Sequence, residues 1–564
     1  MGKWSKIAAV IVVSASSGAL AERPVYYQAC DGYGAPTESG DGMTAPARGL
    51  LGLTAPLGSA GNTRRTTPQI GQMGVAACDR ALSDPRLVER HSLRRASLLR
   101  ARAVHDLAAG DRAAAARDLD AASSAIRQPD DLYIQRSMKA GIVLVRAYLL
   151  RTGGDQEAAA QMLAPLWADR PLSRQFGLGV IAALGDGSPT LAGEPVLQAL
   201  ARLDPRLIAA MYADAFDRRD FGRVIALSNQ LASPAVTVDI GTSSAEAKVQ
   251  VAENDRRILL IAAEQHGALA YSLASLGRDD AAKSTLAEAE ANVARLTPKL
   301  FDPVAPGGKE GGKARLARSI NTALSEAGAA AKARLTAWRD FVSLRQAIDR
   351  EPVSSWKGRM ALIQTPPKGV ALDLLAAARA RTSAGEGVTP ETPAELPTGN
   401  ASATDDFVPL FTALPHVEIA ARIPAFKATS TFNQVVWGND DGFKIKSDSA
   451  SGTATIDFTG MKSSASVVEE LALLRAAMLV RDAGKNGFVI VGRRDYQRSV
   501  TTTYNGVPLR TDPSGYTTQL DIEFVDQNAI PDRYRDAPWR VLSTDKVLKL
   551  LEPTYLPAAE VARS

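Results

Sequence analysis

The chain has 564 residues, of which 45% are hydrophobic and 5% aromatic, so it is long enough for several domains and favours Ala-rich helices over an aromatic β core. Its formal net charge is +5, and Lys3 and Lys6 carry two of these charges, which leaves 5 − 2 = +3 without them. Nucleic-acid binders concentrate basic residues on one face, so this balance predicts no nucleic-acid partner.

The first 21 residues have the pattern of a cleaved export signal. Two lysines precede the short apolar stretch 7–13, and Ala19-Leu20-Ala21 fits the small-x-small rule for cleavage after Ala21. No later stretch approaches the roughly 18 uninterrupted apolar residues of a membrane span. The residues before Cys30 lack the motif of a lipoprotein signal. The sequence therefore predicts a periplasmic or secreted protein with no transmembrane segment and no lipid anchor.

Residues 22–72 are rich in Gly, Pro, Thr and Ser, which predicts a leader with little regular structure. The two cysteines, Cys30 and Cys78, are the minimum for one disulfide in an oxidising compartment. Such a bond would tie the leader to the first helices and stabilise the fold by about 4 kcal/mol in the chain-entropy model. Two unpaired thiols are the alternative. No Cys-x-x-Cys occurs to support a redox or zinc role.

Residues 73–382 have a helical pattern in nearly every window. Three segments place Ala or Leu at offsets 5, 9 and 12 after a glycine: Gly110 with Ala115, Leu119 and Ala122; Gly154 with Ala159, Leu163 and Leu166; and Gly277 with Ala282, Leu286 and Ala289. These offsets share one helical face, so the two helices of a hairpin can approach closely. The glycines lie 44 and 123 residues apart, with a weaker unit at Asp220-Phe221-Gly222-Arg223, which indicates a degenerate array.

These hairpins resemble tetratricopeptide repeats. The match is the Gly-Asp loop followed by the Ala and Leu positions, and Pro171 stands where that family's repeat ends. The family's period of about 34 residues and the Trp and Tyr of its first helices are absent. The resemblance implies a right-handed superhelix whose concave face holds a peptide or protein segment, without catalysis.

The last part of the chain changes character after a linker at 383–405. In residues 406–564, strand patterns at 442–446, 453–458, 487–491, 500–504 and 516–525 surround a helix to about Ala483. Ser466-Val-Val-Glu469 has the pattern of a capping box at its start. Turns are expected at 506–508 and 513–515, and a last helix at 544–551. The fold class predicted for the whole chain is mainly α, with a helical-hairpin array followed by a small α+β domain.

This C-terminal part is similar to small α+β domains of bacterial envelope lipoproteins, which have no assigned activity. The similarity lies in the helix at Glu469-Glu470, the strand 487–491 that follows it, and the Ser/Thr-rich strand 499–503.

A cationic face precedes the first two Gly-Asp loops. Arg95 and Arg102 lie on one helical face, and Lys139 and Arg146 occupy the equivalent places 44 residues later. On the concave face of the array, these cations would form a peptide-binding groove suited to a carboxylate or another anionic group. A solvated outer face without a partner is the alternative.

Patterns typical of catalysis or of cofactors are missing. The four histidines are scattered, and neither His-Glu-x-x-His nor Gly-x-Ser-x-Gly occurs. The Gly-rich stretch 307–314 lacks the Ser or Thr that follows the Lys of a phosphate-binding loop. We therefore predict no catalytic residue, cofactor or metal. After Val491 the chain gathers arginines and tyrosines, which suit either a protein interface or the solvated face of a sheet: Arg493, Arg494, Tyr496, Arg498, Tyr504 and Tyr516.

The sequence thus predicts a non-enzymatic scaffold of the bacterial cell envelope that binds a protein or peptide. Two alternatives stay open. One is a hydrolase acting on an envelope polymer, with the helical array as its recognition arm. The other is a structural subunit that self-associates through the array.

Overall fold

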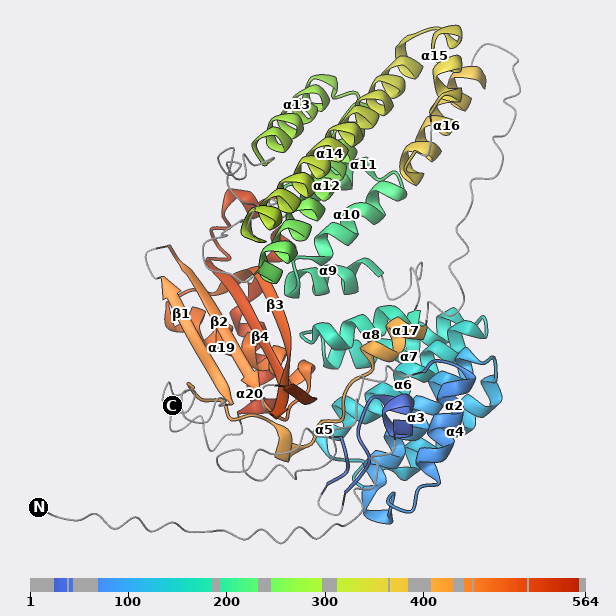
Figure 1. Cartoon of the computed structure of the whole chain (residues 1–564), viewed down its shortest axis with the longest axis vertical. Coiled ribbons are helices and arrows are strands. Elements are labelled where there is room, and N and C mark those ends of the chain that lie inside the picture. Colours follow the sequence, from blue (N-terminus) through green and yellow to red (C-terminus); the bar gives the residue numbers. More distant parts are fainter. Residues whose placement is uncertain are drawn as a thin grey trace, which may run out of the picture.

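The computed structural model describes residues 25–37, 40–43, 69–184, 193–231, 245–296, 312–363, 366–383, 407–429, 441–448, 451–504 and 507–556. The predicted export signal with its cleavage after Ala21, the predicted linker beyond Ser383 and the Gly-rich stretch up to residue 311 lie outside these residues. The described chain is mostly helical and ends in a five-stranded antiparallel sheet with helices (Figure 1), which confirms the predicted fold class.

The first group of helices ends at Leu203. It comprises α1 (Val25–Asp31), α2 (Gln72–Leu82), α3 (Ser92–Ala108), α4 (Arg112–Ala125), α5 (Leu132–Ile134), α6 (Ala140–Thr152), α7 (Gln156–Asp169), α8 (Arg174–Leu184) and α9 (Gly193–Leu203). Helix α1 lies inside the predicted leader, so the expectation of little regular structure is wrong for its seven residues.

The second group is built around two long helices, α12 and α14, which pack against each other. It comprises α10 (Leu207–Asp217), α11 (Phe221–Ser228), α12 (Ala245–Ser275), α13 (Asp279–Leu296), α14 (Gly312–Arg350), α15 (Val353–Ala361) and α16 (Lys368–Ser383). Gly267 permits the close approach of α12 to α14, because a Cβ there would lie 2.1 Å from the Trp338 ring.

The three predicted glycine loops each connect the two helices of a hairpin. Gly110, Gly154 and Gly277 have φ angles of 87°, 91° and 73°, a region that favours glycine. In the first two hairpins the next residue caps the second helix: Asp111 accepts a hydrogen bond from the Ala114 backbone N–H and Asp155 from that of Ala158. The predicted small and apolar face is buried at every position except Leu166, which is half-buried.

The weaker unit near Asp220 is a fourth hairpin, α10–α11, with the same capping arrangement. Asp220 accepts a hydrogen bond from the Arg223 backbone N–H. The loop position with positive φ is held by Arg219, at 62°, instead of glycine. A side chain in this region costs energy. The sequence signal of this unit is weak because its loop lacks the glycine that marks the other three.

The sheet has the strand order β1-β2-β4-β3-β5, and every neighbouring pair is antiparallel. Its strands are β1 (Gly442–Asp448), β2 (Thr453–Gly460), β3 (Gly487–Tyr504), β4 (Val507–Val525) and β5 (Leu542–Ser543). Helix α19 (Ala465–Asp482) contacts strands β2, β3 and β4, and α20 (Thr544–Tyr555) packs on α19.

Two local predictions in this part are wrong. The N-cap of α19 is Ser464, which accepts a hydrogen bond from the Val467 N–H, and Glu469 does not close a capping box because its carboxylate is bound by more distant groups. The expected turn at 513–515 lies inside β4. Pro513 pairs with Ser499, and a register shift in β3 between Gln497 and Ser499 absorbs the irregularity.

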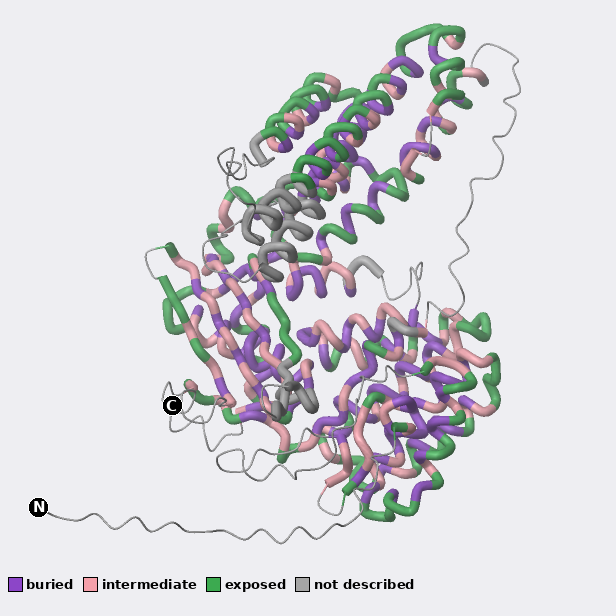
Figure 2. Tube along the Cα trace, viewed as in Figure 1, coloured by how far each residue is buried: buried purple, intermediate pink, exposed green. Residues whose placement is uncertain are grey.

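The apolar interior divides into two main clusters that do not follow the order of the chain (Figure 2). The first joins helices up to Leu203 to residues 410–417, α19, α20 and one face of the sheet. The second joins residues of α9 to α16. Leu207 lies against both clusters. The first helices and the sheet therefore share one core.

Candidate functional site at the junction of helices and sheet

Buried ion pairs connect the first helices to α19. Glu470 accepts hydrogen bonds from Arg136 Nη2 at 2.9 Å and from Arg170 Nε at 2.7 Å, and it also contacts the Tyr555 hydroxyl. Both arginines and Glu470 are almost fully excluded from solvent. Burial opposes ionisation of Glu470, but the charges of Arg170 and Arg136 outweigh it and lower the pKa of this carboxyl.

Glu418 belongs to the same cluster, on the segment that follows α17 (Phe407–Ala413). Its Oε1 accepts hydrogen bonds from Arg170 Nη2 at 3.1 Å and the Ser464 hydroxyl at 2.9 Å, whereas its Oε2 is buried without a partner. Burial, with the negative charge of Glu470 nearby, raises the pKa of Glu418 despite Arg170. The two glutamates share Arg170, yet their pKa values shift in opposite directions. Glu470 is paired with two arginines, whereas Glu418 is paired with only one.

Glu469, the neighbour of Glu470, makes a second set of contacts. It accepts hydrogen bonds from the Ser173 hydroxyl at 2.7 Å, the Gln175 backbone N–H at 2.9 Å and Arg493 Nη2 at 2.5 Å. Arg493 comes from β3 and also donates to the Leu203 carbonyl at 3.3 Å. Burial raises the pKa of Glu469 against the charge of Arg493. One acidic dipeptide thus fastens α19 to α8, to the end of α9 and to the sheet.

The contacts continue to the loop between α9 and α10. Buried Asp204 accepts hydrogen bonds from Arg174 Nε at 2.5 Å and Arg206 Nε at 2.7 Å. Burial opposes its ionisation, but hydrogen bonds from Arg206 and the positive charges nearby lower the pKa of Asp204. Arg206 also reaches Asp495 of β3, at 3.3 Å. The loop is therefore tied to the edge of the sheet.

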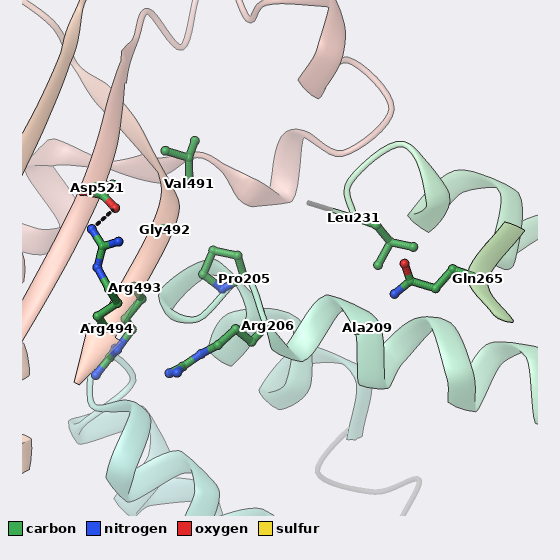
Figure 3. A pocket seen from close by; sticks show the side chains of 10 residues that line it. All are labelled: Pro205, Arg206, Ala209, Leu231, Gln265, Val491, Gly492, Arg493, Arg494 and Asp521. Carbon is green, nitrogen blue, oxygen red and sulfur yellow. Dashed lines mark hydrogen bonds and ion pairs between the residues drawn. The ribbon is translucent and has the colours of Figure 1, made fainter. Parts of the chain in front are cut away.

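A cavity of about 310 Å³ opens where this loop, α12 and the sheet meet (Figure 3). The lining residues come from four parts of the chain: Pro205, Arg206 and Ala209; Leu231; Gln265; and Val491, Gly492, Arg493, Arg494 and Asp521. The Arg206 and Arg494 side chains are 56% and 53% exposed. Asp521 is paired with Arg494 at 2.8 Å and accepts from the Thr455 hydroxyl at 2.8 Å.

This arrangement suits binding. The walls offer apolar surface beside guanidinium donors, a composition typical of protein interfaces. Across the described ranges, no group of three or more His, Cys, Asp or Glu residues is placed to hold a metal ion. None of the helices in those ranges has the length and apolar character of a membrane span.

The predicted cationic residues lie in contacts between helices. Arg102 of α3 donates from Nε to Asp118 of α4 and from Nη1 to Asp79 of α2, both at 2.6 Å. Arg146 of α6 pairs with Asp120 of α4 at 2.6 Å.

The other two predicted cations are placed differently. Arg95 donates to the Leu87 carbonyl at 3.1 Å, and Lys139 is half-buried in a π-helical turn. Arg102 and Arg146 thus join helices, whereas Arg95 binds a carbonyl outside the helices. Their role as a peptide groove stays a prediction.

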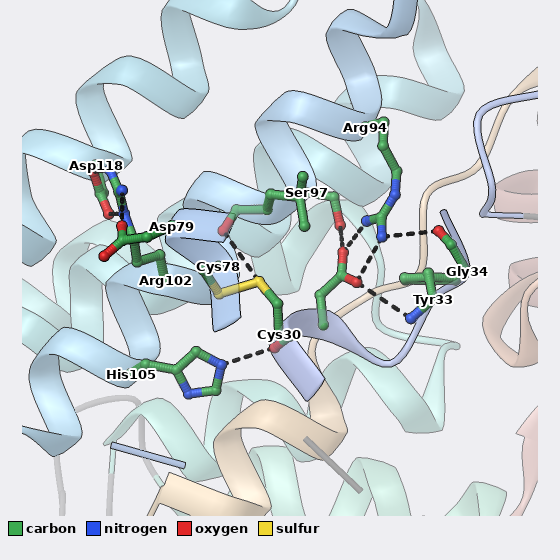
Figure 4. The surroundings of a disulfide bond; sticks show 12 residues. Cys30, Tyr33, Gly34, Cys78, Asp79, Arg94, Ser97, Arg102, His105 and Asp118 are labelled. Carbon is green, nitrogen blue, oxygen red and sulfur yellow. Dashed lines mark hydrogen bonds and ion pairs between the residues drawn. A yellow bond between two sulfur atoms is a disulfide. The ribbon is translucent and has the colours of Figure 1, made fainter. Parts of the chain in front are cut away.

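Cys30 and Cys78 form a disulfide that joins α1 to α2 (Figure 4). Next to it, fully buried Arg94 pairs with Asp31, donating from Nη2 to Oδ1 at 2.9 Å, and the Ser97 hydroxyl also donates to Asp31. His105 Nε2 lies 2.7 Å from the Cys30 carbonyl oxygen. These contacts give α1 a tertiary reason to be helical, which its composition did not reveal.

The Arg- and Tyr-rich region of β3 has two faces. Arg493 is buried against Glu469, while Arg494 and Tyr496 are about half exposed. The side chains of Arg498 and Tyr504 lie outside those described. Sequence reasoning missed Arg206, Gln265 and the Glu469-Glu470 pair. Two adjacent acids in an otherwise apolar helix were the available signal, since such a helix is buried and its acids need partners.

No protein-family model matches this chain, and neither the curated proteins nor the solved structures give a match.

Proposed function

We propose that this protein is a non-enzymatic scaffold of the bacterial cell envelope that binds a protein or peptide partner. In this proposal the hairpins are degenerate tetratricopeptide-like units, and the chain acts after export to the periplasm or beyond the cell. The observation that carries the proposal is the open cavity at the junction, whose walls come from four separated parts of the chain.

The fixed position of these walls supports the proposal. The α9–α10 loop is held through Asp204 and Arg206, and β3 is held through Arg493 and Glu469. Walls that are already in place lose little conformational entropy when a partner binds. We assign the binding site to the junction because the cavity opens there beside the exposed guanidinium groups of Arg206 and Arg494.

The exposed guanidinium groups of Arg206 and Arg494 support the expectation that the partner carries an anionic group. Each has donors to spare, since Arg carries five N–H groups. Charge-assisted hydrogen bonds to a carboxylate are stronger than neutral ones.

Site-specific photo-cross-linking in the native envelope tests this function. A photoreactive amino acid replaces Ala209, an exposed residue of the cavity wall, and in a control protein it replaces Lys357, an exposed residue of α15. We expect a discrete protein adduct from position 209 that is absent from position 357. Equal labelling from both positions, or none from either, would contradict the proposal.

The nature of the adduct separates the alternatives. An adduct with a second copy of the chain would favour the self-associating subunit, and an adduct with an envelope glycan would favour the hydrolase.

A further inference from the structure

Among the described residues, strands pair with the outer edge of β3 over only a short part of its length. On one side β3 pairs with β4 from Gly487 to Tyr504, and on the other it pairs with β5 only at Gly487 and Phe488. Arg540 then donates to the Ile490 carbonyl at 2.9 Å. Beyond that point, no strand among the described ranges pairs with this side. An open edge presents backbone donors and acceptors to any extended chain that reaches it.

This edge reaches the surface beside the cavity. Val491 is 43% exposed, and Arg494, Asp495 and Tyr496 form an exposed run on β3. The register of β3 against β4 shifts between Ile490 and Gly492. Such a bulge re-aims nearby side chains, which accounts for an exposed Val491 next to buried Ile490.

The cavity is continuous with the open edge. Residues 491–494 of β3 form one wall, and Pro205, Ala209 and Leu231 supply apolar surface from the facing elements (Figure 3). A chain lying along β3 would therefore direct alternate side chains toward this space, since side chains alternate along a strand.

The guanidinium donors of the cavity wall indicate which side chain would enter beside the apolar one. The lining contains three arginines and one carboxylate. Arg206 uses Nε and Nη2 on Asp204 and Asp495, and Arg494 uses Nε and Nη2 on Gln519 and Asp521. Within the described chain, neither arginine uses its Nη1 in a contact, so both can bind a further carboxylate.

We propose that β3 binds an extended segment of a partner protein as an added strand, with an apolar side chain in the cavity and, two residues along the segment, an acidic side chain at Arg206 and Arg494. Backbone hydrogen bonds would supply affinity, and the cavity with its arginines would supply selectivity. This inference rests on the proposed function and names the class of partner segment.

Labelled peptides test the added strand. The probe is fluorescein-labelled Thr-Val-Thr-Glu-Thr, whose Val and Glu share one face of an extended strand, and its matched control is Thr-Val-Thr-Lys-Thr. Fluorescence anisotropy with the full chain should give saturable binding of the acidic peptide and at least about tenfold weaker binding of the basic one. The double variant Arg206→Gln/Arg494→Gln should weaken binding of the acidic peptide by about tenfold or more, whereas Arg218→Gln, at an exposed arginine just after α10, should leave it unchanged.

Backbone methylation separates strand pairing from simple charge attraction. Two versions of the acidic peptide carry N-methyl groups on opposite edges of the extended backbone. An added strand pairs through one edge, so only one version should lose binding. Equal effects of the two versions, or no saturable binding of the acidic peptide, would overturn the inference.

Two further measurements separate the possible failures. Circular dichroism of the double variant verifies that it is folded, so that lost binding reports the site. Light scattering shows whether a second copy occupies the edge, an outcome that would also overturn the inference. A specific adduct at position 209 together with unselective peptides would leave the proposed function standing and remove the added strand.

Discussion

Glu470 of α19 and Arg170, which precedes it by 300 residues in the chain, form a buried ion pair with 2.7 Å between Oε1 and Nε. The two side chains are 0% and 2% exposed, so each depends on protein groups to replace water. This pair lies inside the core shared by the first helices and the sheet. It fixes how those two parts of the chain face each other.

Removing the carboxylate should therefore be costly. Glu470→Ala leaves Arg136 and Arg170 buried without this partner and should lower the free energy of unfolding by about 3–5 kcal/mol, measured by urea denaturation. Glu552→Ala is the control, because Glu552 pairs with Arg481 at 3.4 Å in a partly exposed position; we expect a loss below about 1 kcal/mol. Similar losses for the two variants would contradict the assigned role of Glu470.

The opposite pKa shifts of Glu470 and Glu418 predict opposite pH profiles. A lowered pKa means that ionised Glu470 stabilises the fold above its unfolded pKa, so Glu470→Gln should be less stable than the wild type at neutral pH. This deficit should shrink as the pH falls below the unfolded pKa of about 4.5 toward the folded value.

Glu418 has a raised pKa, so its ionised form costs stability at neutral pH. Glu418→Gln should therefore be relatively more stable at neutral pH, and its advantage should vanish as the pH falls through the folded pKa to about 4.5. Denaturation of both variants and the wild type from pH 8 to well below the unfolded pKa of about 4.5 measures these differences. Parallel profiles for the two variants would contradict the assignment.

The disulfide between Cys30 and Cys78 should stabilise the attachment of α1. The bonded residues are 48 positions apart, and opening a loop of this size should cost about 2–4 kcal/mol of unfolding free energy. Thermal melts with and without a reducing agent measure the effect. The Cys30→Ser/Cys78→Ser variant should melt like the reduced wild type and ignore the reductant; a variant as stable as the oxidised protein would refute this.

Gly267 and Gly358 offer a matched pair of helical glycines. Gly267→Ala places a methyl group against the Trp338 ring and should destabilise the fold by about 1–3 kcal/mol. Gly358→Ala in α15 meets no atom within 4 Å, so it should stabilise the helix by up to about 1 kcal/mol. Chemical denaturation that gave the same sign for both substitutions would disagree with the packing of α12 on α14.

Arg219 holds the loop position that glycine holds in the other three hairpins. Arg219→Gly should raise the free energy of unfolding by about 1 kcal/mol, because glycine adopts a positive φ without the clash of a Cβ. The only hydrogen bond described for its side chain is a 3.5 Å bond to the Leu372 carbonyl, so little is lost. Unfolding curves that place the variant below the wild type would contradict this.

Local features of the sequence were sufficient to predict the hairpins. The glycine loops at Gly110 and Gly154, and the buried Ala and Leu positions after them, follow from φ preference and helical periodicity. The strands at 442–446 and 453–458 were predicted by alternation and lie within β1 and β2.

The site depended on distant pairings that no local pattern contains. Arg136 and Glu470 are 334 positions apart, and Ser173 and Glu469 are 296 apart. Glu469 fitted a capping box in the sequence, yet Arg493 and Ser173 bind its carboxylate, so tertiary contacts determine its role. Arg102 likewise fitted the predicted peptide-binding stripe. In the folded chain it pairs instead with Asp79 and Asp118, which the sequence pattern could not indicate.

The division of the interior into two cores has a topological consequence. The chain leaves the first core after Leu203 and returns to it at Leu410, so the second core is an insertion into the first. Both ends of this insertion connect to the first core. Its helices can therefore change in length or sequence without disturbing the ion pairs of Glu469 and Glu470. Helix α14, which contributes no residue to the cavity wall, can change in this way, whereas Gln265 ties α12 to the cavity.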